Sequence, residues 1–320
     1  MQPKTSVTHP STAPTREHST TGSVTSADGT TIGYRQYGHG PGIVLVQGGM
    51  GSAPNFMQLA EALSRAFTVY VPDRRGRGLS GPYGNDYSIQ KDVEDVDALL
   101  TKTGTHALFG LSTGGLIALQ AALTLPAIHK VAIYEPALSV NGSTPLDWVR
   151  RYDQEMAQGK VAAALITGMK GPKMGPLIFN FIPSFLLEPL FKVMLAREDK
   201  EGSGKYLPMR TLAPTLHHDG QLLIEMSGTL ERFRALSAEV LLLGGSKSPA
   251  FQKVSLDALE KVLPHVTRVE FPGLGHAGYS HGRWWRIRQA SANPLLAGFF
   301  VNGQSEQTIS PWSEAPSDLF

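Results

Sequence analysis

A serine between two glycines is the clearest chemical feature of the sequence. Gly110-Leu111-Ser112-Thr113-Gly114 fits the pattern G-x-S-x-G and follows an apolar run. Where a strand turns sharply into a helix, this pattern lifts the serine hydroxyl above the sheet, at a helix end whose N–H groups favour negative charge. The pattern therefore predicts that Ser112 is a nucleophile, rather than a serine that only caps a glycine-rich turn.

A hydroxyl is a poor nucleophile near neutral pH and needs a general base. His276 lies in the loop "PGLGHAG", after the last apolar strand, and we expect it to be that base. His281 is the alternative. The other histidines, including His217 and His218, have no convincing metal-ligand spacing near them, and we expect them at the surface or in an inserted segment.

Strand-like and helix-like stretches alternate along the first part of the chain, and this alternation would position Ser112. The apolar segments "GIVLVQGG", "FTVYVPD", "HALFGL" and "KVAIYEP" are typical of buried strands, and the stretch Ser88–Thr103 has the apolar spacing of an amphipathic helix. Alternation of this kind is typical of parallel strands joined by right-handed crossovers. We predict an α/β fold with a doubly wound, mostly parallel sheet.

The alternation stops near Val140 and resumes at "EVLLLGG", which suggests an insertion rich in Pro, Gly and Met. Helical pieces are expected there at 145–158 and 184–197. The predicted organisation is a sheet-containing core, a helical cap inserted over the carboxyl edge of the sheet, and two loose tails. The core covers 23–139 and 239–301, the cap 140–238, and the tails 1–22 and 302–320.

Four segments of this chain resemble, in the same order, the motifs of the α/β-hydrolase family. They are "VLVQGGMG", "DRRGRGLS" (Asp73–Ser80), the serine motif and "PGLGHAG", and the likeness spans about residues 23 to 300. The resemblance implies an acyl-transfer enzyme with two N–H donors for the oxyanion. The N–H of Thr113 follows the nucleophile, and comparison with the family places the second donor at Gly49. For "DRRGRGLS" it implies a mainly structural role.

The acidic partner of the histidine departs from the usual family pattern. In most relatives it follows the penultimate strand, where this chain has Lys247-Ser248, and Asp257 falls inside the next predicted helix. Some α/β-hydrolases place the acid instead after the strand that follows the serine helix, and the resemblance therefore implies Glu135 in "VAIYEP". Two local features favour it as well: a carboxylate after a buried strand needs a partner, and Pro136 biases Glu135 toward an extended conformation. Glu135 would hold the tautomer of His276. The alternative is that it braces the inserted segment.

The composition of the chain excludes several classes of protein and of site. The chain has 29 Lys and Arg against 27 Asp and Glu, a net charge of +2, so nucleic acid is not an expected partner. Without cysteine there is no disulfide framework and no thiol nucleophile. No apolar run is long enough for a membrane span, and no secretory signal precedes the core, which favours a cytoplasmic protein. We expect no cofactor and no metal. A homodimer is compatible with the sequence.

The expected reaction is hydrolysis of a carboxylic ester or lactone through an acyl-enzyme on Ser112. Methionine and phenylalanine residues of the insertion suggest an apolar roof, and hence a hydrophobic small-molecule substrate. A cap combined with this placement of the glutamate is similar to some fungal lactone hydrolases. Two alternatives stay open: a non-catalytic ligand receptor or interaction protein of the same fold, and a C–C hydrolase, lyase or cofactor-free peroxidase that uses the same residues.

Overall fold

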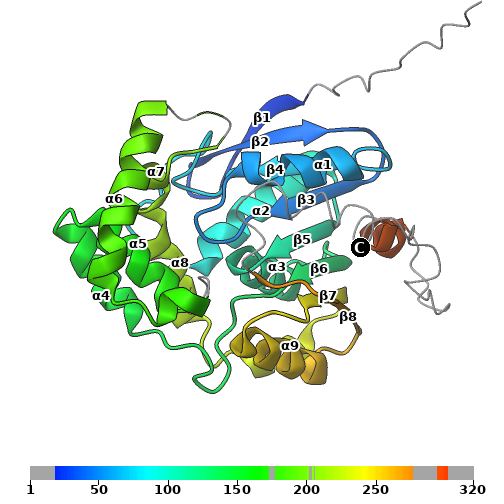
Figure 1. Ribbon diagram of the computed structural model, residues 1–320. Coiled ribbons are helices and arrows are strands. Elements are labelled where there is room, and N and C mark those ends of the chain that lie inside the picture. Colours follow the sequence, from blue (N-terminus) through cyan, green and yellow to red (C-terminus); the bar gives the residue numbers. More distant parts are fainter. Residues whose placement is uncertain (1–18, 173–176, 202–203, 205, 277–293, 302–320) are drawn as a thin grey trace, which may run out of the picture.

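The computed structural model describes residues 19–172, 177–201, 204, 206–276 and 294–301, and within them eight strands form one sheet (Figure 1). The strand order is β1-β2-β4-β3-β5-β6-β7-β8. The strands β1 and β2 run antiparallel to their neighbours, and the others are parallel. The predicted fold class is confirmed. The strands are β1 (Thr20–Thr25), β2 (Thr31–Tyr37), β3 (Gly42–Val46), β4 (Thr68–Pro72), β5 (Ala107–Leu111), β6 (Lys130–Tyr134), β7 (Glu239–Gly245) and β8 (Val266–Phe271).

The amino-terminal hairpin corrects one predicted boundary. Strand β1 pairs with β2 from Thr20, which lies opposite Gln36, so residues 20–22 belong to the sheet and not to a tail. Threonine suits a paired strand, and the turn at Asp28-Gly29 fixes the register because Gly29 adopts a φ of +85°. Residues 1–18 lie outside the described part of the chain.

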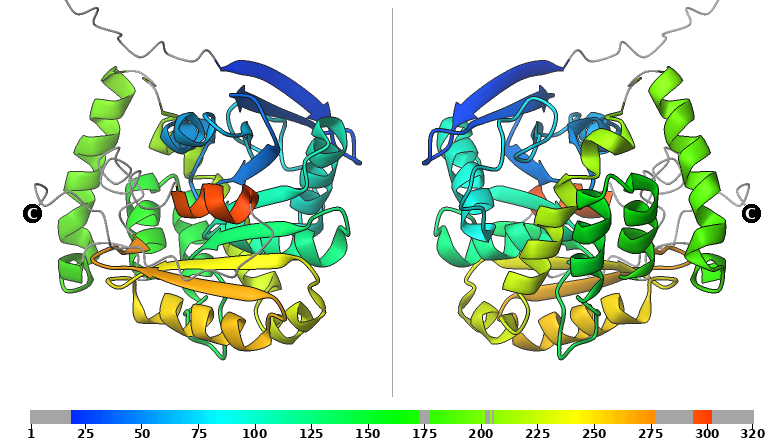
Figure 2. Two further views of the ribbon diagram at one scale, coloured as in Figure 1. Left: turned by 90° about the vertical axis from the view of Figure 1, so that its right-hand side faces the viewer. Right: turned by 90° about the vertical axis from the view of Figure 1, so that its left-hand side faces the viewer.

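Helices cover both faces of the sheet (Figure 2). Alternate residues of β3 enter two different hydrophobic clusters: Val44 belongs to the cluster that contains residues of α2, α3 and α9, and Ile43 to the one that contains residues of α1 and of 294–301. This double cover explains why the parallel strands are apolar on both faces. These core helices are α1 (Met57–Leu63), which follows the 3-10 turn η1 (Ala53–Phe56), α2 (Ile89–Thr103), α3 (Thr113–Thr124) and α9 (Ala250–Val262).

Between β6 and β7 the chain forms a group of helices beside the sheet (Figure 1), and we call α4 to α8 the inserted helices. Two of them correspond to the helical pieces expected at 145–158 and 184–197: α4 lies within the first, and α6 begins at Ser184 and extends past the end of the second. The bounds 140–238 of a cap stay a prediction. The elements between β6 and β7 are α4 (Trp148–Ala157), α5 (Val161–Lys170), η2 (Leu177–Asn180), α6 (Ser184–Glu201), α7 (Met209–Leu212), α8 (Thr215–Glu225) and η3 (Leu230–Ala235).

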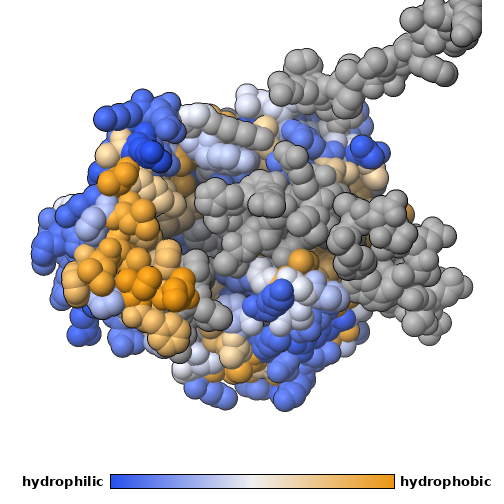
Figure 3. Space-filling view, viewed as in Figure 1, coloured by the Kyte–Doolittle hydropathy of each residue, from blue (hydrophilic) through white to orange (hydrophobic). Residues whose placement is uncertain are grey.

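An exposed apolar patch lies on the inserted helices (Figure 3), and the exposed apolar side chains of α6 include Phe185, Leu186, Leu190 and Val193. Phe181 and Phe185, which the sequence suggested as part of an apolar roof, are 83% and 70% exposed. Met226, from the same set, is buried in the main core. Within the described residues, none of the helices combines the length and the apolar character that a bilayer crossing requires.

Candidate active site

Ser112 lies at a strained corner between β5 and α3. Its backbone has φ 53° and ψ −116°, a conformation that non-glycine residues rarely adopt and that is often found at functional sites. The flanking glycines permit this corner. A Cβ on Gly110 would lie 2.4 Å from the carbonyl oxygen of Gly114, and a Cβ on Gly114 would lie 2.2 Å from that of Val46. The spacing of the serine motif is therefore a steric requirement of the turn.

The backbone of Ser112 is tied to the residues on both sides of Glu135. Its N–H donates to the carbonyl oxygen of Tyr134 (3.0 Å), and its own carbonyl oxygen accepts from the N–H of Ala137 (3.1 Å). These two bonds bring the serine corner and the end of β6 together. Within the described residues, the N–H of Thr113 has no recorded backbone acceptor, as expected for the first residue of a helix.

His276 and Glu135, 141 positions apart in the sequence, meet directly. The Nδ1 atom of His276 lies 2.7 Å from Oε2 of Glu135, and the side chains are 5% and 0% exposed. A carboxylate in this position favours the tautomer that carries a proton on Nδ1, which leaves Nε2 as the basic nitrogen. The structure thus brings together two of the three residues expected to carry catalysis.

The backbone of Glu135 is not extended, so that expectation was wrong. Its φ is +43°, in the left-handed region. The contacts around it account for the turn: the N–H of Glu135 donates to Leu243 in β7, while two residues later the N–H of Ala137 donates to Ser112. The sheet on one side and the serine corner on the other together override the local preference of a residue before proline.

Two neutral donors hold the second oxygen of Glu135. Oε1 accepts from the N–H of Gly245 (2.9 Å) and from the hydroxyl of Ser248. Ser248 stands where most family members are expected to have their acid, and its contact with Glu135 was missed from the sequence. The sequence offered a signal for this contact. When the acid is at the end of β6, the position after β7 that usually holds the acid can carry a residue that hydrogen-bonds to it.

Of the alternative acid and histidines considered from the sequence, those in the described residues have partners outside the Ser112 corner. Asp257 is on α9 and pairs with Arg268, and its side chain is 55% exposed. His281 lies outside the described residues. His217 pairs with Asp153, and His218 stacks on Tyr83.

No hydrogen bond between the Ser112 hydroxyl and the His276 ring is recorded in the described part of the chain. In ligand-free enzymes this bond is often long and tightens only when substrate binds. What unites the two residues here is the Glu135 segment, since Ser112 holds its backbone and His276 holds its carboxylate.

The loop expected to supply an oxyanion donor packs against Ser112. Residues 48–51 form a turn closed by the N–H of Gly51 and the carbonyl oxygen of Gly48 (3.2 Å). A Cβ on Gly48 would lie 3.0 Å from the Cβ of Ser112, so the loop approaches the nucleophile at its backbone. Gln47, which replaces a histidine common in the family, donates to the carbonyl oxygen of Pro72 and so has a structural contact.

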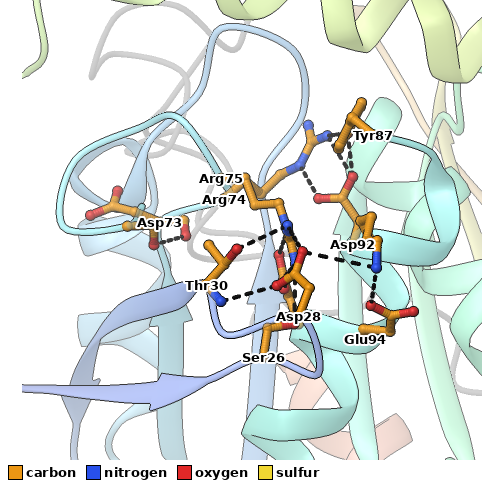
Figure 4. Close-up of polar contacts among 12 residues, drawn as sticks. Ser26, Asp28, Thr30, Asp73, Arg74, Arg75, Tyr87, Asp92 and Glu94 are labelled. Carbon is orange, nitrogen blue, oxygen red and sulfur yellow. Dashed lines mark hydrogen bonds and ion pairs between the residues drawn. The ribbon is translucent and has the colours of Figure 1, made fainter. Parts of the chain in front are cut away.

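The segment "DRRGRGLS" braces this region. The carboxylate of Asp73 accepts from the N–H groups of Ala53 (2.7 Å) and Leu79 (3.0 Å), which fixes the path of the chain on both sides of β4. Arg75 is fully buried and pairs with Asp28 of the first hairpin (Figure 4). It also pairs with Asp95 of α2 and so links the hairpin to this helix. These contacts agree with the structural role expected from the sequence.

No group of three or more histidine, aspartate or glutamate side chains could hold a metal ion among the residues described.

A sheet of this order, with a strained serine after β5 and a histidine after β8, is the arrangement of the α/β hydrolases. The chain matches the model of the alpha/beta hydrolase family over residues 43–286 and belongs to that family. Its fold and family are those of a hydrolase.

Individual proteins similar to this chain are also hydrolases. A pimeloyl-[acyl-carrier protein] methyl ester esterase of Xanthomonas oryzae is 25% identical over 76% of this chain and 90% of its own length. The uncharacterized hydrolase YraK of Bacillus subtilis is 36% identical, but over only 34% of this chain and 42% of that protein. The crystal structure of an alpha/beta hydrolase from Sphaerobacter thermophilus superposes with a TM-score of 0.70 at 28% identity, covering 87% of this chain and 100% of that one.

Proposed function

We propose that this protein hydrolyses carboxylic esters or lactones of hydrophobic small molecules through an acyl-enzyme on Ser112. The observation that carries the proposal is the contact between His276 and Glu135, beside a serine in a strained corner. The methyl ester esterase among the similar proteins supports the choice of an ester bond.

In the first half of the proposed reaction, the Ser112 oxygen attacks the carbonyl carbon of the substrate, and Nε2 of His276 takes the hydroxyl proton. The carbonyl oxygen becomes an oxyanion, which accepts hydrogen bonds from the N–H groups of Gly49 and Thr113. When the intermediate collapses, His276 returns the proton to the leaving alkoxide. An alcohol departs from an ester, whereas the alcohol of a lactone stays attached to the acyl group.

In the second half, His276 removes a proton from water, and the resulting hydroxide attacks the acyl carbon. Collapse of the second intermediate releases the carboxylic acid and returns the proton to the Ser112 oxygen. Glu135 stabilises the imidazolium in both halves, and its contacts with Gly245 and Ser248 keep one oxygen directed at the ring.

We further propose that the inserted helices form a cap over the substrate. Their apolar composition favours a hydrophobic acyl or alcohol group over a charged one. A series of p-nitrophenyl esters of increasing chain length, compared with lactones of matched size, tests this specificity through kcat/KM. Equal rates across the series would contradict an apolar site.

The test of the reaction itself is the variant Ser112→Ala with p-nitrophenyl acetate and butyrate. Loss of the nucleophile should lower kcat about a millionfold. Labelling of the unmodified protein by a fluorophosphonate, located on Ser112 by peptide mass spectrometry, should disappear in the variant. Undiminished turnover by Ser112→Ala would refute the acyl-enzyme, and absence of turnover by the unmodified protein on all esters and lactones would favour a ligand receptor.

A further inference from the structure

A carboxylate of the inserted helices is buried against two arginines of the core. Asp219, on α8, lies 2.7 Å from Nη1 of Arg74 through Oδ1 and 2.7 Å from Nη2 of Arg77 through Oδ2. All three side chains are nearly or fully buried. Burial alone would raise the pKa of Asp219, but the guanidinium groups of Arg77 and Arg74 hold it below its usual value. Asp219 is therefore a carboxylate with its charge fixed.

Arg77 connects this carboxylate to the turn at residues 48–51. Its Nη1 donates to the carbonyl oxygens of Gly48 (2.9 Å) and Gly51 (2.8 Å), which are the two ends of that turn. The same guanidinium binds Asp219 through Nη2. Because the guanidinium is planar and rigid, its orientation toward Asp219 also sets its orientation toward the turn.

Asp219 also approaches the turn directly. Its Oδ2 lies 3.4 Å from the N–H of Met50, and a Cβ on Gly49 would lie 3.2 Å from the same oxygen. Arg74, which binds the other oxygen of Asp219, is itself held by Asp92 (Figure 4). The carboxylate therefore has a fixed support on one side and the turn on the other.

Met50 shows that the turn is held from outside. Its φ is +52°, in a region that favours glycine, and its side chain packs against a cluster formed by the inserted helices. That cluster contains Ala162, Leu165, Leu195 and Ala213. A residue other than glycine keeps this backbone conformation only when its surroundings impose it. Here the surroundings are the inserted helices and Asp219.

We propose that Asp219 is a positioning residue, which acts through Arg77 and Met50 to hold the N–H of Gly49 in place for the oxyanion. The oxyanion hole is then complete only while α8 is seated on the core. This inference rests on the function proposed above, since it assigns Asp219 a part in stabilising an oxyanion formed at Ser112.

The test compares Asp219→Asn with the unmodified protein on p-nitrophenyl butyrate, with kcat expressed per fluorophosphonate-reactive site. Asparagine keeps the shape but loses the charge that orients Arg77. We expect kcat to fall at least about tenfold, less than the loss of a whole oxyanion donor, while KM changes little. The inhibition constant of an alkyl boronic acid, which forms a tetrahedral adduct with the serine, should rise by the same factor as kcat/KM falls.

Three further variants distinguish an effect on the position of the turn from an effect on folding. Arg77→Lys keeps the charge but cannot bind Asp219 and both carbonyl oxygens of the turn at once. If Asp219→Asn does not fold, Arg77→Lys should show the same fall in kcat and the same loss of boronic acid affinity. Met50→Gly, added to Asp219→Asn, should recover part of kcat because glycine adopts a positive φ unaided. Asp153→Asn removes a carboxylate of α4 that is hydrogen-bonded to His217 and does not contact the turn, and it should leave kcat unchanged.

The outcomes are distinguishable from those of the proposed function. If the unmodified protein and Ser112→Ala are equally inactive on esters and lactones, the proposed function fails. If the unmodified protein is active and Asp219→Asn and Arg77→Lys retain its kcat and boronic acid affinity, the positioning role alone is overturned. A fall in kcat without a matching loss of boronic acid affinity would also overturn it, because the oxyanion contacts would then be intact.

Discussion

One buried carboxylate lies beside the Ser112 corner and another beside the turn at residues 48–51, and the two are held by different kinds of partner. Glu135 receives hydrogen bonds from a backbone N–H and a serine hydroxyl, and its one ionisable partner among the described residues is His276. Asp219 lies between two guanidinium groups. Both carboxylates are almost fully excluded from solvent, at 0% and 2% exposure.

The difference indicates what each carboxylate can do. An arginine stays protonated at any working pH, so Asp219 faces a constant positive charge and suits a fixed support. Glu135 faces an imidazole, whose charge changes when it accepts a proton from a nucleophile. The neutral donors around Glu135 orient it without cancelling its charge, and the charge remains available to stabilise an imidazolium.

The largest effect that distinguishes the two regions is expected from Glu135→Gln. An amide in place of the carboxylate can stabilise neither the imidazolium nor the required tautomer, so kcat should fall by about 10⁴-fold. Steady-state kinetics with p-nitrophenyl butyrate measure it. Asp257→Asn is the matched control, since that carboxylate is on the outside of α9, and it should change kcat little. The reverse ranking would remove Glu135 from the proposed mechanism.

Features that depend on local pattern were predictable from the sequence. The apolar strands, the helix at Ser88–Thr103 and the glycines around Ser112 follow from periodicity and from the sterics of one turn. The choice of Glu135 rested on the alternative acid position of some α/β-hydrolases and on the cost of an unpaired carboxylate after a buried strand. In the structure its Oε2 contacts Nδ1 of His276, and its catalytic role stays a prediction.

Features that depend on packing between distant segments were not predictable. Asp219 and Arg77 are 142 positions apart, and nothing in their local sequences indicates that they pair. The positive φ of Glu135 contradicts its local preference before proline, because contacts with two neighbouring elements decide it. A sequence pattern locates the inserted helices without showing which of their polar residues reaches the core, as Asp219 of α8 does.

A smaller effect is expected from Ser248→Ala, which removes one of the two neutral donors to Glu135. The net contribution of such a hydrogen bond is about 1 kcal/mol, so kcat should fall roughly five- to tenfold. The thermal midpoint should fall by only about 2 °C, because the carboxylate keeps Gly245 and His276. Ser246→Ala, in the same loop, is a suitable control, because among the described residues its hydroxyl accepts from the N–H of Gly273 and has no hydrogen bond to Glu135. Equal kcat for Ser248→Ala and the unmodified protein would show that the backbone N–H alone orients Glu135.

The last expected effect is on the pH dependence of the free energy of unfolding rather than on catalysis, and it distinguishes Asp219 from a carboxylate at the surface. Because the two arginines lower the pKa of Asp219 in the folded state, its charge stabilises the fold above the unfolded pKa of about 4, and this contribution is lost as the pH falls through the folded value. Urea unfolding of the unmodified protein and of Asp219→Asn should therefore show a gap in free energy that is constant near neutrality and narrows toward acid. Asp153→Asn, whose carboxylate is part-exposed beside His217, should show a much smaller gap. A gap that widens toward acid would mean that burial, rather than the two guanidinium groups, dominates the ionisation of Asp219, and the contrast drawn with Glu135 would then fail.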